Sequence, residues 1–307
     1  MFKTIPAAAV VLAAWLTAAS AQDTPMRIAF PSGMNGQIVV TMEKAEIAKK
    51  KGLNASFASF QYGPPMMEAL AAGSIDAVVT SLMPITAYAA KVPGDVKVVA
   101  ALGNSSHSLM VAKESSVTEI SALAGKKLGV SFGSDSHLDV LVWLKQIKLD
   151  GKVELINVAP AELATAIANK SVDAIVIRQP QVLRLQQQSD ARILHTWPFR
   201  FVSIVKTKFI ASQPKAFKKY MEALRESLFF IAQNKEQSAK WFGEYLRVDP
   251  AVVQTVSKDD PNYAAKSPSD IDISITPAAR QLIGKWTEDA YAEKMIRSKV
   301  DLGNLFH

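Results

Sequence analysis

The chain has 307 residues, a formal net charge of +7 at pH 7 and no cysteine. The lack of cysteine excludes disulfides, thiolate metal sites and a lipid-modified cysteine after a signal sequence. The positive charge tolerates an anionic ligand but does not predict nucleic-acid binding, because the basic clusters 49–51 and 218–219 lie in helical patterns typical of solvated faces.

Residues 1–21 have the pattern of a secretory signal. One early charge, Lys3, precedes a run rich in alanine, valine and leucine, and small residues stand at Ala19 and Ala21, where cleavage is expected. No other stretch is apolar over the roughly 20 residues that a transmembrane helix needs. The mature protein, from Gln22, is therefore expected to be free in a bacterial periplasm.

From Met26 onward, short apolar runs alternate with helical patterns, which predicts an α/β fold with a largely parallel sheet. In the first part of the chain we expect strand 26–30, helix 38–50, strand 55–60, helix 65–72 and strand 75–80. The order then repeats as strand 126–132, helix 138–148, strand 153–158, helix 161–169 and strand 172–177. Long amphipathic helices follow, expected at 214–233, 236–246, 250–256 and 277–296, and their aromatic residues are interpreted as core packing.

A weak internal repeat supports two similar units. LAAGSIDAVV, residues 70–79, aligns with IANKSVDAIV, residues 167–176, and places Asp76 and Asp173 in register. We interpret each aspartate as the cap of a helix-to-strand turn, the alternative being a catalytic role. Two such units predict two lobes, and without a proline- or serine-rich linker the lobes must be joined by short hinge strands near 103–111 and 192–202.

The segment VSFGSDSHLDVLVWL, residues 130–144, places small and polar residues between two apolar runs. The second run has helical spacing, so this turn is a predicted helix N-terminus, where unpaired N–H groups and the helix dipole can hold an anion. A serine that only caps the helix explains Ser134 or Ser136 equally well.

In open α/β sheets, ligands bind beyond the carboxyl ends of strands, beside helix N-termini. This rule selects polar and small residues that follow the predicted strands. They are Ser32, Gly33, Met34, Asn35, Tyr62, Gly63, Thr80, Ser81, Gly133, Ser134, Ser136, His137, Pro160, Ala161, Glu162, Arg178 and Gln179.

Arg178 follows four apolar residues, so its side chain starts at the mouth of the expected cleft. A guanidinium there could grip a carboxylate or sulfonate through two parallel hydrogen bonds. The alternative is a surface arginine or the partner of an acid on the opposite lobe.

The histidines do not predict a metal or an enzyme site. His107, His137, His195 and His307 are far apart and lack a second ligand three or four residues away. His137 is expected to donate to the anion, the alternative being a side chain that points to solvent, while His107 and His195 near the hinges are interpreted as structural hydrogen-bonding groups. No nucleophile elbow, metalloprotease helix motif or P-loop occurs, so neither a cofactor nor a metal is expected.

The two α/β units, the phrase NVAPAELATAIANKSVDAIVI and a helical tail with TPAARQLIGKW and DLGNLF resemble one family. The chain is similar to periplasmic substrate-binding proteins of the sulfonate, nitrate and taurine type, with the two-lobed type II periplasmic-binding fold. The resemblance implies a monomer that closes two lobes over a small molecule and delivers it to an inner-membrane ABC permease. The implied lobes are 22–105 with 198–307, and 106–197.

The resemblance also implies that the turn 133–137 offers hydroxyls and backbone amides to an anionic group. Arg178, Gln179 and Pro180 stand where many relatives have an aromatic residue and an acid before the proline. This departure favours a carboxylated ligand over a plain alkanesulfonate.

Two other functions remain open on the sequence. Thiamine-pyrimidine synthases and a menaquinone-pathway dehydratase resemble this architecture, but they act in the cytosol, so the signal sequence argues against an enzyme. A receptor that hands its ligand to a membrane sensor cannot be separated from a transport component by these residues.

Overall fold

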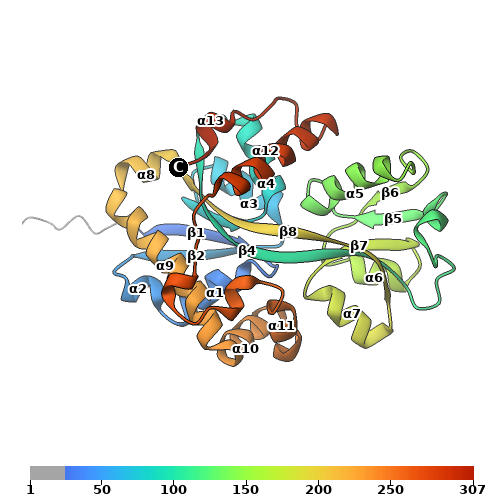
Figure 1. Ribbon diagram of the computed structural model, residues 1–307, viewed down its shortest axis with the longest axis horizontal. Coiled ribbons are helices and arrows are strands. Elements are labelled where there is room, and N and C mark those ends of the chain that lie inside the picture. The colour runs from blue at the N-terminus through green and yellow to red at the C-terminus, as the bar shows by residue number, and fades with distance from the viewer. Residues whose placement is uncertain (1–24) are drawn as a thin grey trace, which may run out of the picture.

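The computed structural model describes residues 25–307, so the predicted signal sequence lies outside the described residues. One eight-stranded sheet runs through the molecule in the order β2-β1-β3-β8-β4-β7-β5-β6 (Figure 1). The strands are β1 Met26–Pro31, β2 Ala55–Phe60, β3 Ala77–Thr80, β4 Val96–Val111, β5 Lys127–Val130, β6 Glu154–Asn157, β7 Ala174–Arg178 and β8 Arg192–Lys206.

The helices account for most of the remaining chain. They are α1 Gly36–Lys44, α2 Ile47–Lys50, α3 Gly63–Ala71, α4 Leu82–Lys91, α5 Asp135–Gln146, α6 Leu163–Ala168, α7 Gln181–Ser189, α8 Thr207–Ser212, α9 Pro214–Gln233, α10 Lys235–Leu246, α11 Pro250–Ser257, α12 Pro277–Ala292 and α13 Leu302–Leu305. Three short 3-10 helices add η1 Ile120–Leu123, η2 Pro261–Ala264 and η3 Pro268–Asp270. Among the described residues, no helix is long and apolar enough to cross a membrane.

The sheet is mixed, not largely parallel as expected. Three strands run parallel at each end, and β4 and β8 between them are antiparallel to each other and to their outer neighbours. The expected short hinges 103–111 and 192–202 lie inside these two long strands, which have 16 and 15 residues. The residues of β4 and β8 do not alternate regularly between apolar and polar, so the sequence does not predict these strands. Pairing with the neighbouring strands makes them extended.

The strands and helices form two lobes that share β4 and β8. Figure 1 shows the first lobe, with β1–β3, α1–α4 and α8–α13, beside the second lobe, with β5–β7 and α5–α7. Each lobe has its own hydrophobic clusters, centred on residues such as Met42 and Phe242 in the first lobe and Leu128 and Ile175 in the second. This arrangement agrees with the two-lobed α/β fold expected from the sequence.

The repeat of the sequence is a repeat of structure. The Asp76 carboxylate accepts the backbone N–H of Arg27 at 2.9 Å, and the Asp173 carboxylate accepts that of Lys127 at 2.8 Å. Each aspartate therefore caps the start of the first strand of its unit, β1 or β5. The prediction that these carboxylates cap backbone N–H groups is confirmed.

Most predicted helices are present, one of them is divided, and four helices were not predicted, namely α4, α7, α8 and α13. The expected helix 38–50 is two helices, because the chain turns at Glu46, whose φ is +53°, and this turn buries Ile47 and Ala48. Helix α4 was not expected, because eight of its ten residues are buried and no polar face marks the helical period.

The aromatic residues of the C-terminal helices pack as predicted. Tyr220 and Phe242 are fully buried, and Phe217, Phe230 and Trp241 pack against the same cluster. Tyr245 is the exception, with 37% of its surface exposed while its ring contacts Phe30 and Phe242.

Candidate functional site

A cavity of about 430 Å³ lies between the two lobes. This volume is in the range of small-molecule sites. Its wall is made by the six turns that lead from β1, β2, β3, β5, β6 and β7 into α1, α3, α4, α5, α6 and α7. Because a helix N-terminus presents unpaired N–H groups, the wall combines six such ends around one space.

Most of the residues selected from the sequence line this cavity. They are Ser32, Gly33, Tyr62, Gly63, Thr80, Ser81, Ser134, Ser136 and Arg178, together with Pro160, Ala161 and Gln179. Met34, Asn35, Gly133, His137 and Glu162 do not line it. The fold thus brings both halves of the predicted site to one place, although the selected segments lie up to 147 positions apart, from 32 to 179.

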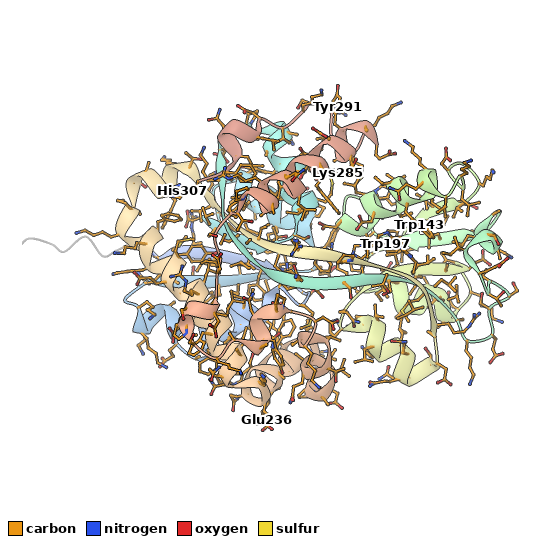
Figure 2. All side chains as sticks on the ribbon, viewed as in Figure 1. Trp143, Trp197, Glu236, Lys285, Tyr291 and His307 are labelled. Atoms are coloured by element: carbon orange, nitrogen blue, oxygen red, sulfur yellow. The ribbon has the colours of Figure 1, made fainter. Side chains whose placement is uncertain are left out.

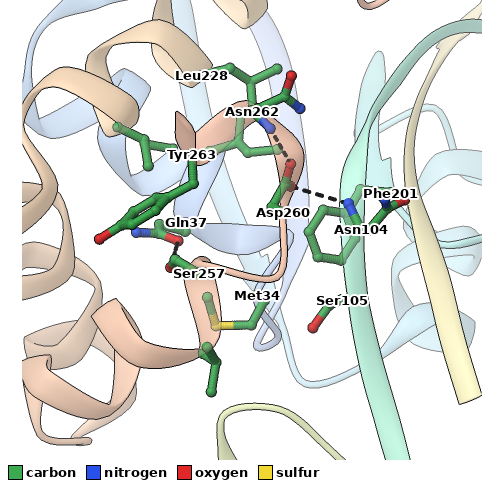
Figure 3. A pocket seen from close by; sticks show the side chains of 13 residues that line it. Met34, Gln37, Asn104, Ser105, Phe201, Leu228, Ser257, Asp260, Asn262 and Tyr263 are labelled. Atoms are coloured by element: carbon green, nitrogen blue, oxygen red, sulfur yellow. Dashed lines mark hydrogen bonds between the residues drawn. The ribbon is translucent and has the colours of Figure 1, made fainter. Parts of the chain in front are cut away.

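Met34 and Asn35 turn away from the cavity because α1 begins at Gly36. Met34 lines a second, much smaller cavity of about 30 Å³, shown in Figure 3 beside Gln37, Asn104 and Asp260. Asn35 is fully buried, and neither atom of its amide has a hydrogen-bond partner. The small cavity has room for roughly one water molecule and not for an organic ligand.

Gly133, in the turn before α5, and His137, in the first turn of α5, contact each other and do not line the cavity. The Gly133 N–H donates to His137 Nδ1 at 3.3 Å, and the His137 ring stacks on Phe132 with centroids 4.3 Å apart. Burial lowers the pKa of His137 to about 4, so the imidazole is neutral at pH 7. The stacking with Phe132 explains why His137 does not point into the cavity as expected.

Ser134 is the N-cap of α5. Its Oγ accepts the His137 N–H at 3.3 Å, donates to the Ser131 carbonyl at 2.6 Å and contacts Ser136 Oγ at 2.9 Å. Ser134 and Ser136 also line the cavity. The two interpretations of this turn are therefore compatible, since one serine caps the helix from the cavity wall.

Asp135, between these two serines, lies in the selected turn 133–137, but no role was assigned to it from the sequence. Its side chain is buried and leaves its own helix to reach α4 of the first lobe. Its carboxylate accepts the N–H groups of Leu82 at 2.9 Å and Met83 at 3.1 Å, and the hydroxyl of Ser81. An acid in the first turn of a helix normally suggests an interaction with that same helix, so the local sequence does not reveal this contact.

Arg178 completes the surroundings of Asp135. Its Nη2 lies 2.9 Å from Asp135 Oδ2, and its guanidinium lies 4.7 Å from the centre of the Phe199 ring. Arg178 is thus the partner of an acid, as one of the two interpretations held, but that acid belongs to its own lobe. Arg178 itself is one of the residues that line the cavity.

The charged side chains of the cavity wall are Arg178 and Arg184, and no acid lines it. Arg184, on α7, hydrogen-bonds to Gln188 and Gln181 and has no carboxylate partner among residues 25–307. Thr80, also in the wall, is 1% exposed and its hydroxyl has no partner. A buried hydroxyl without a partner is costly, so Thr80 Oγ1 is an unsatisfied polar group beside the cavity.

A buried pair lies behind Arg178. His107 Nε2 and Asp139 Oδ2 are 2.9 Å apart without the alignment of a hydrogen bond. Burial lowers the pKa of His107 to about 3, and burial raises the pKa of Asp139 to about 8. Both groups are therefore held neutral near pH 7, so the contact is not an ion pair.

Two tryptophans and His195 close this part of the second lobe. Figure 2 labels Trp143 and Trp197, whose rings meet edge to face at 5.3 Å, and His195 contacts both rings at 5.0 and 4.4 Å. His107 also packs against Trp197. Both histidines lie in a packed aromatic cluster, but the expected hydrogen-bonding role is wrong for His107, because neither of its ring nitrogens has a hydrogen-bond partner among the described residues.

In the described part of the chain, no group of three or more His, Cys, Asp or Glu side chains is placed to hold a metal ion.

Comparisons with known proteins give a consistent picture. Residues 49–238 match the family described as NMT1/THI5 like. A Brucella abortus (strain 2308) protein named only as a binding protein is 27% identical over 254 residues, which cover 78% of this chain and 77% of that protein. The taurine-binding periplasmic protein of Escherichia coli (strain K12) is 27% identical over 184 residues, 57% of each chain.

The fold is also found among solved structures. The crystal structure of the periplasmic aliphatic sulphonate binding protein SsuA from Escherichia coli superposes with a TM-score of 0.76 at 20% identity, and the match covers 92% of each chain. This likeness establishes the fold of the chain.

Proposed function

Because the chain belongs to the NMT1/THI5-like family, with 49–238 matched, we propose that it is the solute-binding component of an ABC importer. It captures a small organic anion between its lobes in the periplasm and presents the closed form to an inner-membrane permease. Relatives named for taurine and aliphatic sulfonates support a sulfonate as the ligand class, and the residues Arg178, Gln179 and Pro180 support a carboxylate as the alternative.

The observation that carries this proposal is the cavity between the lobes. Its wall combines six helix N-termini, the hydroxyl-bearing residues Thr80, Ser134 and Ser136, and two arginines, of which Arg178 is paired with Asp135 and Arg184 is not, and among residues 25–307 no acid lines it. N–H groups, hydroxyls and guanidinium groups are all donors toward negatively charged oxygen. The lining is therefore suited to a carboxylate or sulfonate group.

The hinge is proposed to lie where β4 and β8 pass between the lobes. The lobe boundaries 105/106 and 197/198 are opposite each other in the sheet, since Ser105 pairs with Phe199, Ser106 with Pro198 and His107 with Trp197. Bending both strands at these paired positions would move 106–197 against 22–105 and 198–307 as a rigid body, as in other hinge closures.

A thermal-shift screen of the mature chain tests the ligand class. The panel contains alkanesulfonates, taurine, aliphatic and aromatic carboxylates, nitrate and neutral pyrimidines. A ligand at 100 times its dissociation constant stabilises a protein by about 2.7 kcal/mol, which such a screen detects. We expect hits among the organic anions, and stabilisation by neutral pyrimidines alone would contradict the proposed ligand class.

Incubation of the protein with a bound compound separates a receptor from an enzyme. A receptor returns the compound unchanged, as measured by mass spectrometry. A product that forms reproducibly and disappears in Thr80→Val or Arg184→Ala would instead favour an enzyme on this fold. Co-purification with a permease rather than a sensor kinase supports transport over sensing.

A further inference from the structure

The N-terminus of α4 in the first lobe is capped from the second lobe. Ser81 occupies the N-cap position, but its own side chain does not cap the helix. The first two N–H groups, of Leu82 and Met83, instead donate to the Asp135 carboxylate at 2.9 and 3.1 Å. This contact joins positions that are 52 to 54 residues apart.

Four donors surround that one carboxylate. Ser81 Oγ and Arg178 Nη2 bind Oδ2, while the two backbone N–H groups bind Oδ1. A helix N-terminus, a hydroxyl and a guanidinium are the parts from which proteins build receptors for anionic groups. Here the receptor is complete and already filled, because Asp135 is 0% exposed.

The filled receptor borders the proposed ligand site. Ser81, Arg178 and Thr80 all line the cavity, whereas Asp135 lies behind this wall. Without the Asp135 carboxylate, the α4 N-terminus and Arg178 would present several unpaired donors at the cavity. An external carboxylate or sulfonate would then find its strongest partners there.

We propose that Asp135 determines specificity by acting as a built-in anion: it fills the receptor formed by Ser81, Leu82, Met83 and Arg178 and excludes a negatively charged group of the ligand from that position. The ligand's own charged group is then left to Arg184, the cavity arginine without a carboxylate partner among the described residues. This inference rests on the proposed function of the cavity as a ligand site.

Formate, the smallest carboxylate, is the probe, because it fits the space that Asp135→Ala vacates. In Asp135→Ala, formate should raise the melting temperature saturably, by about 3 °C at ten times its dissociation constant. The wild type should show no such saturable rise. Asp139→Ala is the matched control, because Asp139 lies one turn further along α5 and accepts no hydrogen bond from α4.

Equal formate responses in the wild type, Asp135→Ala and Asp139→Ala would overturn the inference. If Asp135→Ala does not fold even in formate, the isosteric variant Asp135→Asn tests the inference instead. It should lower the melting temperature less in an Arg178→Gln background than in the wild type, and equal losses in the two backgrounds would overturn the proposed receptor. Neither readout uses the natural ligand, so a failed ligand screen leaves the result on Asp135 interpretable.

Discussion

At the scale of single residues, the turn 133–137 combines a structural and a binding role. Ser134 caps α5 through its contact with the His137 N–H and also faces the cavity. Replacement by alanine removes the acceptor of one orphan N–H group, which typically costs about 1 kcal/mol. The effect is therefore expected without any ligand.

We predict that Ser134→Ala lowers the free energy of unfolding of the empty protein by about 1 kcal/mol, as measured by urea denaturation. Ser136→Ala is the control, because among residues 25–307 the Ser136 hydroxyl hydrogen-bonds only to Ser134. Ser136→Ala should lower the free energy of unfolding by less than Ser134→Ala does. A larger loss in Ser136→Ala than in Ser134→Ala would contradict the assignment of the cap.

The buried Asp139 predicts an unusual dependence of stability on pH. Its pKa is raised from 3.8 to about 8 in the folded chain, so the folded state holds a proton that the unfolded state releases. The free energy of unfolding therefore falls as pH rises through this interval. His107 has the opposite effect, because burial lowers its pKa from 6.5 to about 3, but that effect is confined to more acidic pH.

We predict that Asp139→Asn removes a loss of stability of about 2 kcal/mol between roughly pH 6.5 and pH 8, at about 1.36 kcal/mol per pH unit. The measurement is urea denaturation at several pH values. Asp150→Asn, at an exposed site, should keep the wild-type profile. A profile that Asp139→Asn leaves unchanged would show that Asp139 is ionised in the folded chain.

At the scale of elements, β4 carries an irregularity that is held by a carboxylate. The register with β8 shifts between Ala101 and Gly103, and Gly103 has a φ of +145°, which L side chains rarely adopt. The Asp260 carboxylate accepts the Asn104 N–H at 3.1 Å (Figure 3). A Cβ on Gly103 would lie 2.0 Å from Asp260 Oδ2. Position 103 therefore requires glycine for two reasons: its φ is unfavourable for other residues, and Asp260 leaves no space for a Cβ.

We predict that Gly103→Ala lowers the free energy of unfolding by about 3 kcal/mol, since it combines backbone strain with a steric clash. Gly94→Ala is the matched control, because Gly94 also has a positive φ, +77°, but no atom lies within 4 Å of an added Cβ. Chemical denaturation of both variants measures the difference. Equal losses of unfolding free energy in the two variants would mean that the clash with Asp260 contributes nothing to the effect of Gly103→Ala.

At the scale of the whole molecule, apolar packing links the lobes on the α5 side. Leu138 of α5 is buried in a cluster with Met83 of α4 and Ala290 of α12, both in the first lobe. On the same side, Lys145 and Glu293 form an ion pair at 2.7 Å. Together with Asp135, these contacts hold the lobes against each other.

We predict that Leu138→Ala increases the radius of gyration of the ligand-free protein in small-angle scattering, because it weakens the contact between lobes. Leu144→Ala is the control on the same helix, since Leu144 packs inside the second lobe. Both changes should cost about 2–5 kcal/mol of stability, as buried leucines do. Equal radii in the two variants would contradict a role of Leu138 in closure.

Much of the fold and part of the site could be predicted from the sequence, because the signals are local. Helices such as Pro214–Gln233 follow from their own period, and the two units follow from the repeat that aligns Asp76 with Asp173. Turns after strands carry the small and polar residues that mark cavity positions such as Ser32, Thr80 and Ser134.

Only the tertiary structure decides which of these positions act together. The long strands β4 and β8 are ordered by pairing with distant strands, and α4 is hidden by its burial on nearly all sides. The direction of a side chain depends on what lies beside it in space, as His137 shows by stacking on Phe132. Asp135 is the strongest case, because its partners on α4 come from the other lobe, and no local pattern records a hydrogen bond across 53 residues.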